Sequence, residues 1–218
     1  MTEAEAEAFI LAQTAAGRPP LVPEITLHLA SAIAPIWQAT EAALAEAGIE
    51  PPYWAFAWPG GQALARHVLD RPETVRGRSV LDFAAGCGLA AIAAARAGAA
   101  RVAAAERDTL AAVAARLNAA ANHVVIKTIT ADVCASPPGA WDVILAGDVC
   151  YDARMTARVV PWLRTAAGRG TLVLLADPGR AYLPREGLEP LAAYDVAVTR
   201  ELEDREVRRT TVFRLSGT

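Results

Sequence analysis

The chain has 218 residues, of which 54% are hydrophobic, and a formal net charge of −3. This length suits one domain, which we assign to residues 1–218, with a helical and aromatic cap over 1–60 and a core over 61–218. The weak acidic charge gives no electrostatic case for nucleic acid, and no apolar run is long enough to predict a membrane helix. The acidic N-terminus and three unevenly spaced cysteines favour a cytoplasmic protein with reduced thiols and no metal site, which we expect to be a monomer.

The N-terminal part of the chain is expected to be helical. Its stretches with helical periodicity are Glu3–Ala16, Pro23–Ile33 and Pro35–Ala47. The segment Pro51–Gly61 differs, because it carries four aromatic residues within six positions between prolines and glycines. It is either a hydrophobic plug between the cap and the core or an aromatic wall beside a bound ligand. A helix over Gly61–Leu69 is expected to follow it.

From Val80 onward, strand and helix patterns alternate. The predicted strands are Val80–Phe83, Arg101–Ala105, Val124–Ile129, Trp141–Ala146 and Thr171–Ala176, with helices at Leu89–Ala97, Thr109–Ala120 and Met155–Thr165. This alternation predicts a parallel sheet covered on both faces. Two further strands, Ala193–Thr199 and Val207–Leu215, form a C-terminal hairpin that adds one antiparallel strand. We therefore expect an α/β fold: a Rossmann-like, seven-strand twisted sheet, mostly parallel, with helices on both faces and an N-terminal helical extension.

The stretch Ser79–Gly88 reads as a strand, a turn of small residues and the start of a helix. Such a corner lets backbone N–H groups approach a nucleotide closely. Gly86–Ala91 also matches G-x-G-x-x-A, the fingerprint of nicotinamide dinucleotide sites. However, Asp82 precedes these glycines, and its carboxylate would meet the pyrophosphate of a dinucleotide. The corner therefore favours a cationic ligand without phosphate.

Two more acidic residues follow strands in the same way as Asp82. Glu106 follows the second strand of the alternating region, and Asp132 comes just after the third. Ligands of open α/β sheets bind beyond the carboxyl ends of the strands, so the three side chains should line one crevice. They suit an ammonium group, a ribose and an adenine amino group, which S-adenosylmethionine combines without any phosphate. The alternative for Asp82 and Glu106 is that they are helix caps or solvated strand ends.

The fourth strand of this region leads into Asp148 and Tyr151, a carboxylate and an aromatic ring three positions apart. The carboxylate would attract and orient an acceptor amine. The ring would exclude water and favour a cation by cation–π contact. The alternative interpretation is that Asp148 caps the helix that follows.

These motifs resemble those of known enzymes. Val80-Leu81-Asp82-x-x-x-Gly86-x-Gly88 is similar to the first motif of class I, seven-strand methyltransferases, and Asp148-Val149-Cys150-Tyr151 to the D-x-x-Y motif of methyltransferase family 16. More narrowly, the chain resembles the lysine methyltransferases of the electron-transfer flavoprotein β subunit. That likeness rests on Val22–Leu27, Pro52–Leu64, Val75–Asp82, Gly147–Asp152 and Asp177–Arg180.

The resemblance implies a protein-lysine N-methyltransferase that uses S-adenosylmethionine and acts on the flavoprotein β subunit, and bacterial members are also linked to a ribosomal stalk protein. The implied roles are as follows: Asp82, Gly86 and Gly88 hold the methionine end, Glu106 the ribose, Trp58 lies near the cofactor, and Asp148 and Tyr151 face the target lysine. Asp132 is our own assignment for the adenine amino group.

Two residues depart from the family pattern. Ala84 replaces the usual first glycine, which requires that this position avoid a positive φ. Arg107 replaces an apolar residue that commonly lies against adenine, and its methylene stem and flat guanidinium would have to serve there instead.

Two other functions remain open from the sequence. A small-molecule N-methyltransferase would share the sheet and the cofactor motifs, because loops choose the substrate; Trp58 and Asp177–Arg180 argue for a protein substrate. A non-enzymatic, cofactor-binding subunit is the other alternative, against which the Asp148–Tyr151 pair argues.

Overall fold

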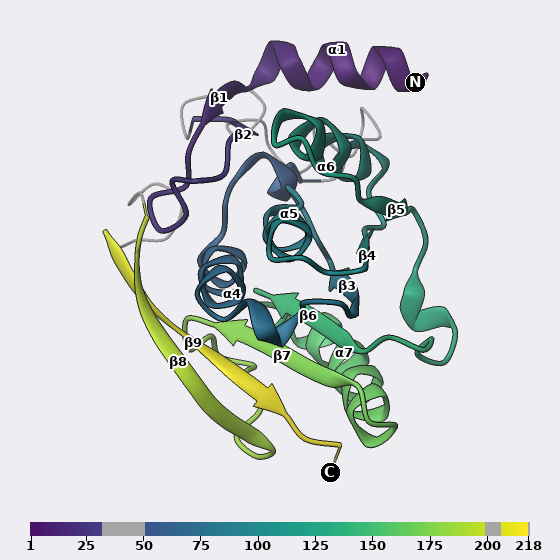
Figure 1. Cartoon of the computed structure of the whole chain (residues 1–218), viewed down its shortest axis with the longest axis vertical. Coiled ribbons are helices and arrows are strands. Elements are labelled where there is room, and N and C mark those ends of the chain that lie inside the picture. Colours follow the sequence, from purple (N-terminus) through teal and green to yellow (C-terminus); the bar gives the residue numbers. More distant parts are fainter. Residues whose placement is uncertain (32–50, 199–205, 218) are drawn as a thin grey trace.

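The computed structural model describes residues 1–31, 51–198 and 206–217 (Figure 1). A seven-stranded sheet of order β5-β4-β3-β6-β7-β9-β8 forms its centre. The strands are β3 (Ser79–Phe83), β4 (Arg101–Ala105), β5 (Lys127–Ile129), β6 (Val143–Gly147), β7 (Leu172–Asp177), β8 (Leu188–Ala197) and β9 (Val207–Leu215). Strands β3 to β7 are parallel, and β9 runs antiparallel to both β7 and β8. The predicted sheet and its C-terminal hairpin are confirmed.

Helices follow the strands as the alternation predicted. They are α4 (Pro59–Asp70), α5 (Leu89–Arg96), α6 (Thr109–Ala121) and α7 (Ala153–Gly168), with short 3-10 helices η1 (Tyr53–Ala55), η2 (Pro72–Thr74) and η3 (Val133–Ala135). Asp108 begins α6 by accepting a hydrogen bond from Leu110 N at 2.8 Å, and Asp152 begins α7 by accepting one from Met155 N at 2.8 Å. Both are standard N-caps, which satisfy N–H groups that have no partner within the helix.

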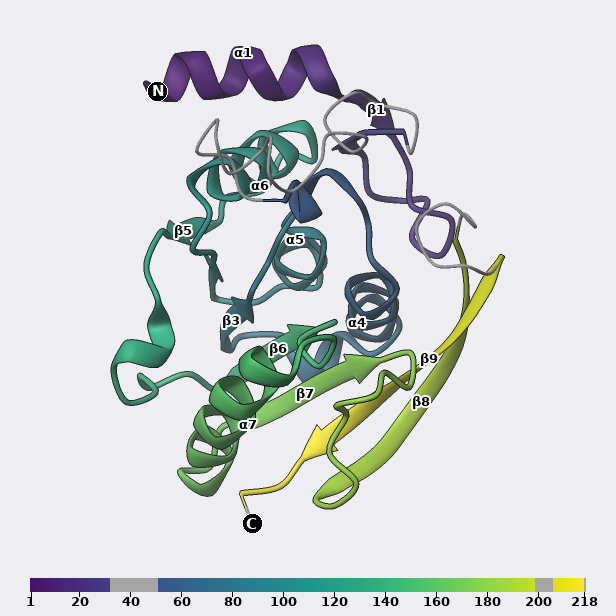
Figure 2. The same cartoon turned by 180° about the vertical axis from the view of Figure 1, so that it is seen from behind.

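The two faces of the sheet bury different sets of side chains. On β4, Val102 and Ala104 pack with residues of α4 and α5, whereas Ala103 and Ala105 pack with residues of α7. This follows from the period of two along a strand. Figures 1 and 2 show α4 and α5 on one side of the sheet and α7 on the other. Helices therefore cover both faces, as predicted.

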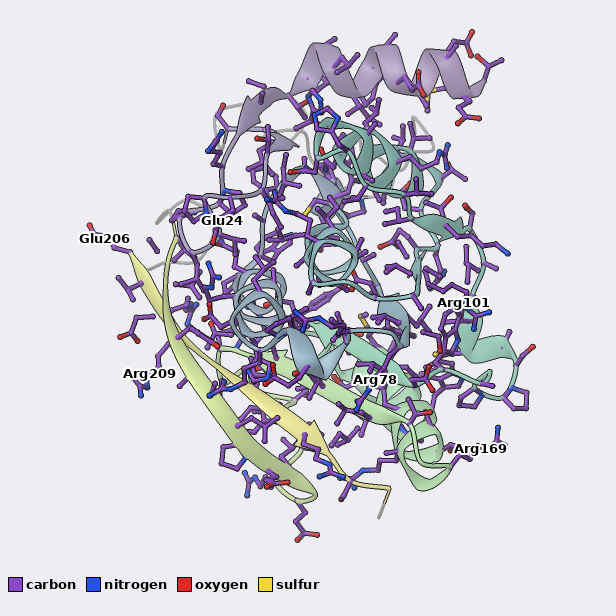
Figure 3. All side chains as sticks on the ribbon, viewed as in Figure 1. Glu24, Arg78, Arg101, Arg169, Glu206 and Arg209 are labelled. Atoms are coloured by element: carbon purple, nitrogen blue, oxygen red, sulfur yellow. The ribbon has the colours of Figure 1, made fainter. Side chains whose placement is uncertain are left out.

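Charged side chains lie mainly around the outside of the fold. Figure 3 labels several of them at the periphery, among them Arg101 and Arg209. Arg101 lies over the ring of Trp141, 4.7 Å from its centroid, and Arg209 pairs with Asp195 across the β8–β9 hairpin at 3.4 Å. No helix among the described residues is long and apolar enough to cross a bilayer.

The N-terminal helix α1 (Glu3–Gln13) starts with a capping box between Thr2 and Glu5. Figure 1 shows this helix next to α6. Glu3 pairs with Arg116 of α6 at 2.6 Å. It ends earlier than predicted, because Ala15–Gly17 forms strand β1.

The helix predicted over Pro23–Ile33 is wrong where the structure describes it. Strand β2 (Leu27–Leu29) lies there instead and pairs antiparallel with β1. The extended backbone is satisfied by α6: Thr26 N donates to Asn122 Oδ1 at 3.0 Å, and His28 N donates to Asn118 Oδ1 at 2.7 Å. The helix predicted over Pro35–Ala47 lies outside the described residues.

Candidate active site

A cavity of about 810 Å³ lies at the carboxyl ends of β3, β4 and β6. Its walls come from the aromatic segment before α4, the turn after β3, the ends of the strands and the start of α7. The predicted site residues that line it are Trp58, Asp82, Ala84, Gly86, Glu106, Arg107, Asp132, Asp148 and Tyr151. Parallel strands present their carboxyl ends at one edge of a sheet, so residues far apart in sequence meet here. Gly88 is outside this lining.

Asp82 is buried at the end of β3 and turns toward α5. Its Oδ2 accepts a hydrogen bond from Ala91 N at 2.8 Å, in the first turn of a helix whose N-cap, Gly88, has no side chain to cap it. Burial, and to a lesser degree the nearby Glu106 carboxylate, raise the pKa of Asp82 to about 7, although the hydrogen bond from Ala91 N acts to lower it. A cation in the cavity would favour the ionised form, whereas a phosphate would be repelled by it. The carboxylate of Asp82 at this helix terminus thus argues against a dinucleotide there.

Gly88 matters for how α5 starts. Its φ is 77°, and a Cβ on it would lie 3.0 Å from the Cβ of Ala115 on α6. Only glycine gives both the left-handed backbone and the close approach of the two helices at this point.

Ala84 has a φ of 53°, so our expectation that it avoids the left-handed region is wrong. This backbone costs a non-glycine residue about 1–2 kcal/mol. The turn is held in place by β4, because Ala85 N donates to Ala105 O at 3.2 Å and Gly86 N donates to Glu106 Oε2 at 3.0 Å. These contacts keep Ala84 in a strained conformation that a glycine would adopt freely.

Glu106 and Asp132 both line the cavity. Besides Gly86, Glu106 binds its own turn, because Oε1 accepts from Arg107 N at 2.8 Å. Asp132 caps η3 by accepting from Cys134 N at 3.1 Å, and its other oxygen pairs with Arg158 of α7. Asp132 is therefore a helix cap that also lines the cavity.

Asp148 follows β6 and joins it to the N-terminus of α4. Its Oδ2 accepts a hydrogen bond from Gly61 N at 3.1 Å. A Cβ on Gly60 would lie 2.6 Å from both Asp148 Oδ2 and Ala176 O. The start of α4 is therefore in close contact with Asp148 and with the end of β7. The alternative that Asp148 caps the helix after it is wrong, since Asp152 caps α7.

The other carboxylate oxygen of Asp148 has a different environment. Oδ1 is buried and has no hydrogen-bond partner, while Nη2 of Arg180 lies 3.7 Å away. Burial raises the pKa of Asp148 to about 7, although Arg180 and the Gly61 N–H act to lower it. A buried acceptor without a donor costs free energy. An ammonium group that entered the cavity would satisfy it.

Aromatic rings line the same cavity as this carboxylate. The ring centroid of Tyr53 lies 5.8 Å from that of Tyr151 and 6.0 Å from that of Trp58, and Trp58 Nε1 donates to Tyr53 O at 2.7 Å. Trp54 is buried in a cluster that includes Ile10 of α1 and residues of α6. The aromatic segment thus serves both as a plug, through Trp54, and as a wall of the cavity.

The sequence had not assigned Tyr53, Arg154, Met155, Arg158 and Arg180 to the site, although all of them line the cavity. Tyr53 and Arg180 lie within the motifs Pro52–Leu64 and Asp177–Arg180, so the sequence does carry a signal for them. Arg154 and Arg158 are four positions apart on α7, a spacing that places two side chains on one face of a helix. Nothing in the sequence indicated which face that was.

The chain is similar in sequence and in fold to known methyltransferases. A family model described as Ribosomal protein L11 methyltransferase (PrmA) matches residues 63–149. A solved magnesium protoporphyrin IX methyltransferase from Synechocystis, with bound SAM, shares the fold: its TM-score is 0.53 at 18% identity, over 72% of this chain and 79% of that one.

Relatives of known name are closer in sequence. The chain is 40% identical over 211 residues to the electron transfer flavoprotein beta subunit lysine methyltransferase of Xenopus laevis, which covers 94% of this chain and 85% of that protein. Its identity to the protein of the same name from Danio rerio is 37% over 200 residues, or 89% and 76% of the two chains. The chain therefore belongs to the family of electron transfer flavoprotein beta subunit lysine methyltransferases.

Proposed function

We propose that this protein transfers methyl groups from S-adenosylmethionine to lysine of the electron-transfer flavoprotein β subunit. One observation carries the proposal: the buried Oδ1 of Asp148 has no hydrogen-bond donor and borders the same cavity as three acids at strand ends. The cavity thus has an acceptor for a cationic amine next to groups suited to the cofactor. The family to which the chain belongs supports the choice of substrate.

S-adenosylmethionine fits the cavity in size and chemistry. A volume of about 810 Å³ is within the usual range for small-molecule sites. Asp82 would hold the ammonium of the methionine end, Glu106 the ribose hydroxyls and Asp132 the adenine amino group. Trp58 and Arg107 would supply flat surfaces beside it. When bound, the cofactor supplies an electrophilic methyl group, whose transfer to a neutral lysine nitrogen leaves S-adenosylhomocysteine.

Asp148 acts first by positioning. Its carboxylate attracts the lysine ammonium and orients the nitrogen, while Tyr151 and Tyr53 exclude water from the entrance. Good alignment of two reacting groups contributes about 7–11 kcal/mol to lowering a barrier.

Asp148 also bears on the proton that the lysine must lose. Free lysine has a pKa of about 10.4, and only its neutral form attacks. Burial between aromatic rings lowers the pKa of the lysine, whereas a carboxylate beside it raises that pKa. With its own pKa raised to about 7, Asp148 is a better proton acceptor than an exposed aspartate. The second role of Asp148 is therefore to accept the proton that the lysine loses, in competition with direct release of that proton to water.

The test uses the purified chain, the flavoprotein β subunit and labelled S-adenosylmethionine. The wild type should label a lysine of the flavoprotein. Asp148→Ala should lose transfer but still bind the cofactor in calorimetry. Asp195→Ala, which removes an exposed carboxylate on β8, is the control and should behave as wild type. Unchanged turnover by Asp148→Ala would contradict the role of Asp148. If the flavoprotein stays unlabelled and the label enters a small molecule when cell lysate is added instead, the other enzyme class is indicated.

A further inference from the structure

We infer that Arg180 is a positioning residue, which holds Asp148 as a carboxylate while leaving Oδ1 open for the ammonium of the substrate. This inference rests on the proposed lysine methylation and extends it to a residue of the loop after β7. It gives a physical reason for the arginine of the Asp-Pro-Gly-Arg motif.

The distance between the two groups is the first argument. Arg180 Nη2 lies 3.7 Å from Asp148 Oδ1, which is close enough for charge attraction but beyond the usual 2.7–3.2 Å of an N–H···O hydrogen bond. Oδ2 is already engaged by Gly61 N. Arg180 thus supplies positive charge to the carboxylate without occupying the acceptor that the substrate needs.

The loop that carries Arg180 is fixed by its own motif. Asp177 Oδ1 accepts hydrogen bonds from Gly179 N at 2.7 Å and Arg180 N at 2.6 Å, and Gly179 has a φ of 83°. The strand end that bears Asp177 is tied to the site, because Asp148 N donates to Ala176 O at 3.0 Å. The aspartate and the glycine of the motif therefore shape a turn that delivers the arginine to Asp148.

Partial burial makes this charge effective. The side chain of Arg180 is 22% exposed and that of Asp148 is 13% exposed. A charge pair interacts more strongly there than in bulk water, because the surrounding protein screens it less.

Other charged and polar groups of the structure also act on the pKa of Asp148. Asp177 of β7 raises its pKa, whereas the N–H groups of Gly60 and Gly61 on α4 lower it, as Arg180 does. The negative charge of Asp148 also acts to raise the pKa of the thiols of Cys87 and Cys150. Mainly through burial, the pKa of each is raised to about 12, so both thiols stay neutral near pH 7. Arg180 is thus the cation that opposes the desolvation of Asp148. Without it, the pKa of Asp148 rises above 7 and the carboxylate is lost at neutral pH.

The test compares Arg180→Gln, Arg180→Lys and Arg185→Gln, a control that removes an exposed charge from the same loop outside the cavity. We measure kcat/KM for the flavoprotein substrate against pH at saturating S-adenosylmethionine. In Arg180→Gln the acidic limb should move up by at least one pH unit, with a loss of about fivefold or more at the wild-type midpoint that is regained at higher pH. Arg180→Lys should return the limb most of the way to its wild-type position, and Arg185→Gln should leave it in place. The affinity for the cofactor should be the same in all three variants as in wild type.

A second readout needs no substrate. In protein labelled with 13C at aspartate carboxyl carbons, the Asp148 resonance, assigned with Asp148→Asn, should titrate at higher pH in Arg180→Gln than in wild type. If wild type does not methylate the flavoprotein but this shift is present, the proposed substrate fails and the role of Arg180 stands. An unmoved Asp148 titration, a rate loss that is equal at every pH, or loss of cofactor binding in Arg180→Gln would each overturn the inference.

Discussion

The backbone N–H of Gly61 donates to Oδ2 of Asp148 at 3.1 Å, although the two residues are 87 positions apart in the chain. This bond joins the helix after the aromatic segment to the loop after β6. The same approach requires glycine at position 147, because a Cβ on Gly147 would lie 2.8 Å from Gly61 N. The glycines of Trp-Pro-Gly-Gly and Gly-Asp-x-x-Tyr together allow the approach that orients the carboxylate of Asp148.

Gly60→Ala should therefore disturb Asp148 directly. The new Cβ would lie 2.6 Å from Asp148 Oδ2 and from Ala176 O, and overpacking of this kind typically costs about 1–3 kcal/mol. We expect a lower melting temperature and reduced methyl transfer. Gly61→Ala is the matched control for stability, because a Cβ there meets nothing within 4 Å. Equal melting temperatures for the two variants would contradict the contact.

Asp82→Ala should strongly weaken binding of S-adenosylmethionine, because the variant loses the carboxylate assigned to the ammonium group. A hydrogen bond to a charged group contributes roughly 1.5–3 kcal/mol, so the affinity should fall about tenfold or more. Isothermal calorimetry measures it. Asp148→Ala is the comparison, with cofactor affinity near that of wild type; a similar loss in both variants would argue against the division of roles.

Asp82 should also contribute to the pH dependence of the free energy of unfolding. Its pKa is raised to about 7 in the folded protein, so the folded state holds this proton more tightly than the unfolded state. The stability from this group is present below about pH 4 and is lost as the pH rises through 7. In urea unfolding of the cofactor-free protein, Asp82→Asn should therefore lose less stability than wild type between pH 5 and pH 8. A larger loss would show that burial does not raise this pKa.

Ala84→Gly should stabilise the protein by about 1 kcal/mol, since it relieves a left-handed backbone at the price of some chain entropy. Ala85→Gly is the control one residue further on. Ala85 does not have a positive φ, so glycine there only adds entropy to the unfolded chain and should destabilise. Thermal unfolding of both variants measures the difference, and destabilisation by Ala84→Gly would refute the strain.

Local sequence features predicted most of the sheet. Arg101–Ala105 and Val207–Leu215 match β4 and β9 residue for residue. The second run is rich in Val, Thr and Phe, which favour strands, whereas the alanine-rich first run is identified by its place between two helical stretches. Strand β2 could not be predicted in this way. Its backbone groups are satisfied by Asn118 and Asn122, roughly ninety positions away, and no local pattern carries that information.

The same division holds for the site. The sequence by itself determined that Asp82, Glu106 and Asp148 end or follow parallel strands, and topology then brings them to one edge of the sheet. Only the tertiary structure decided what each carboxylate does with its two oxygens. Asp148 has one oxygen on the N-terminus of α4 and the other beside Arg180, and its pKa is set by that burial and charge. Hydrogen bonds and desolvation depend on which distant groups come within a few ångströms, and strand and helix patterns do not specify those neighbours.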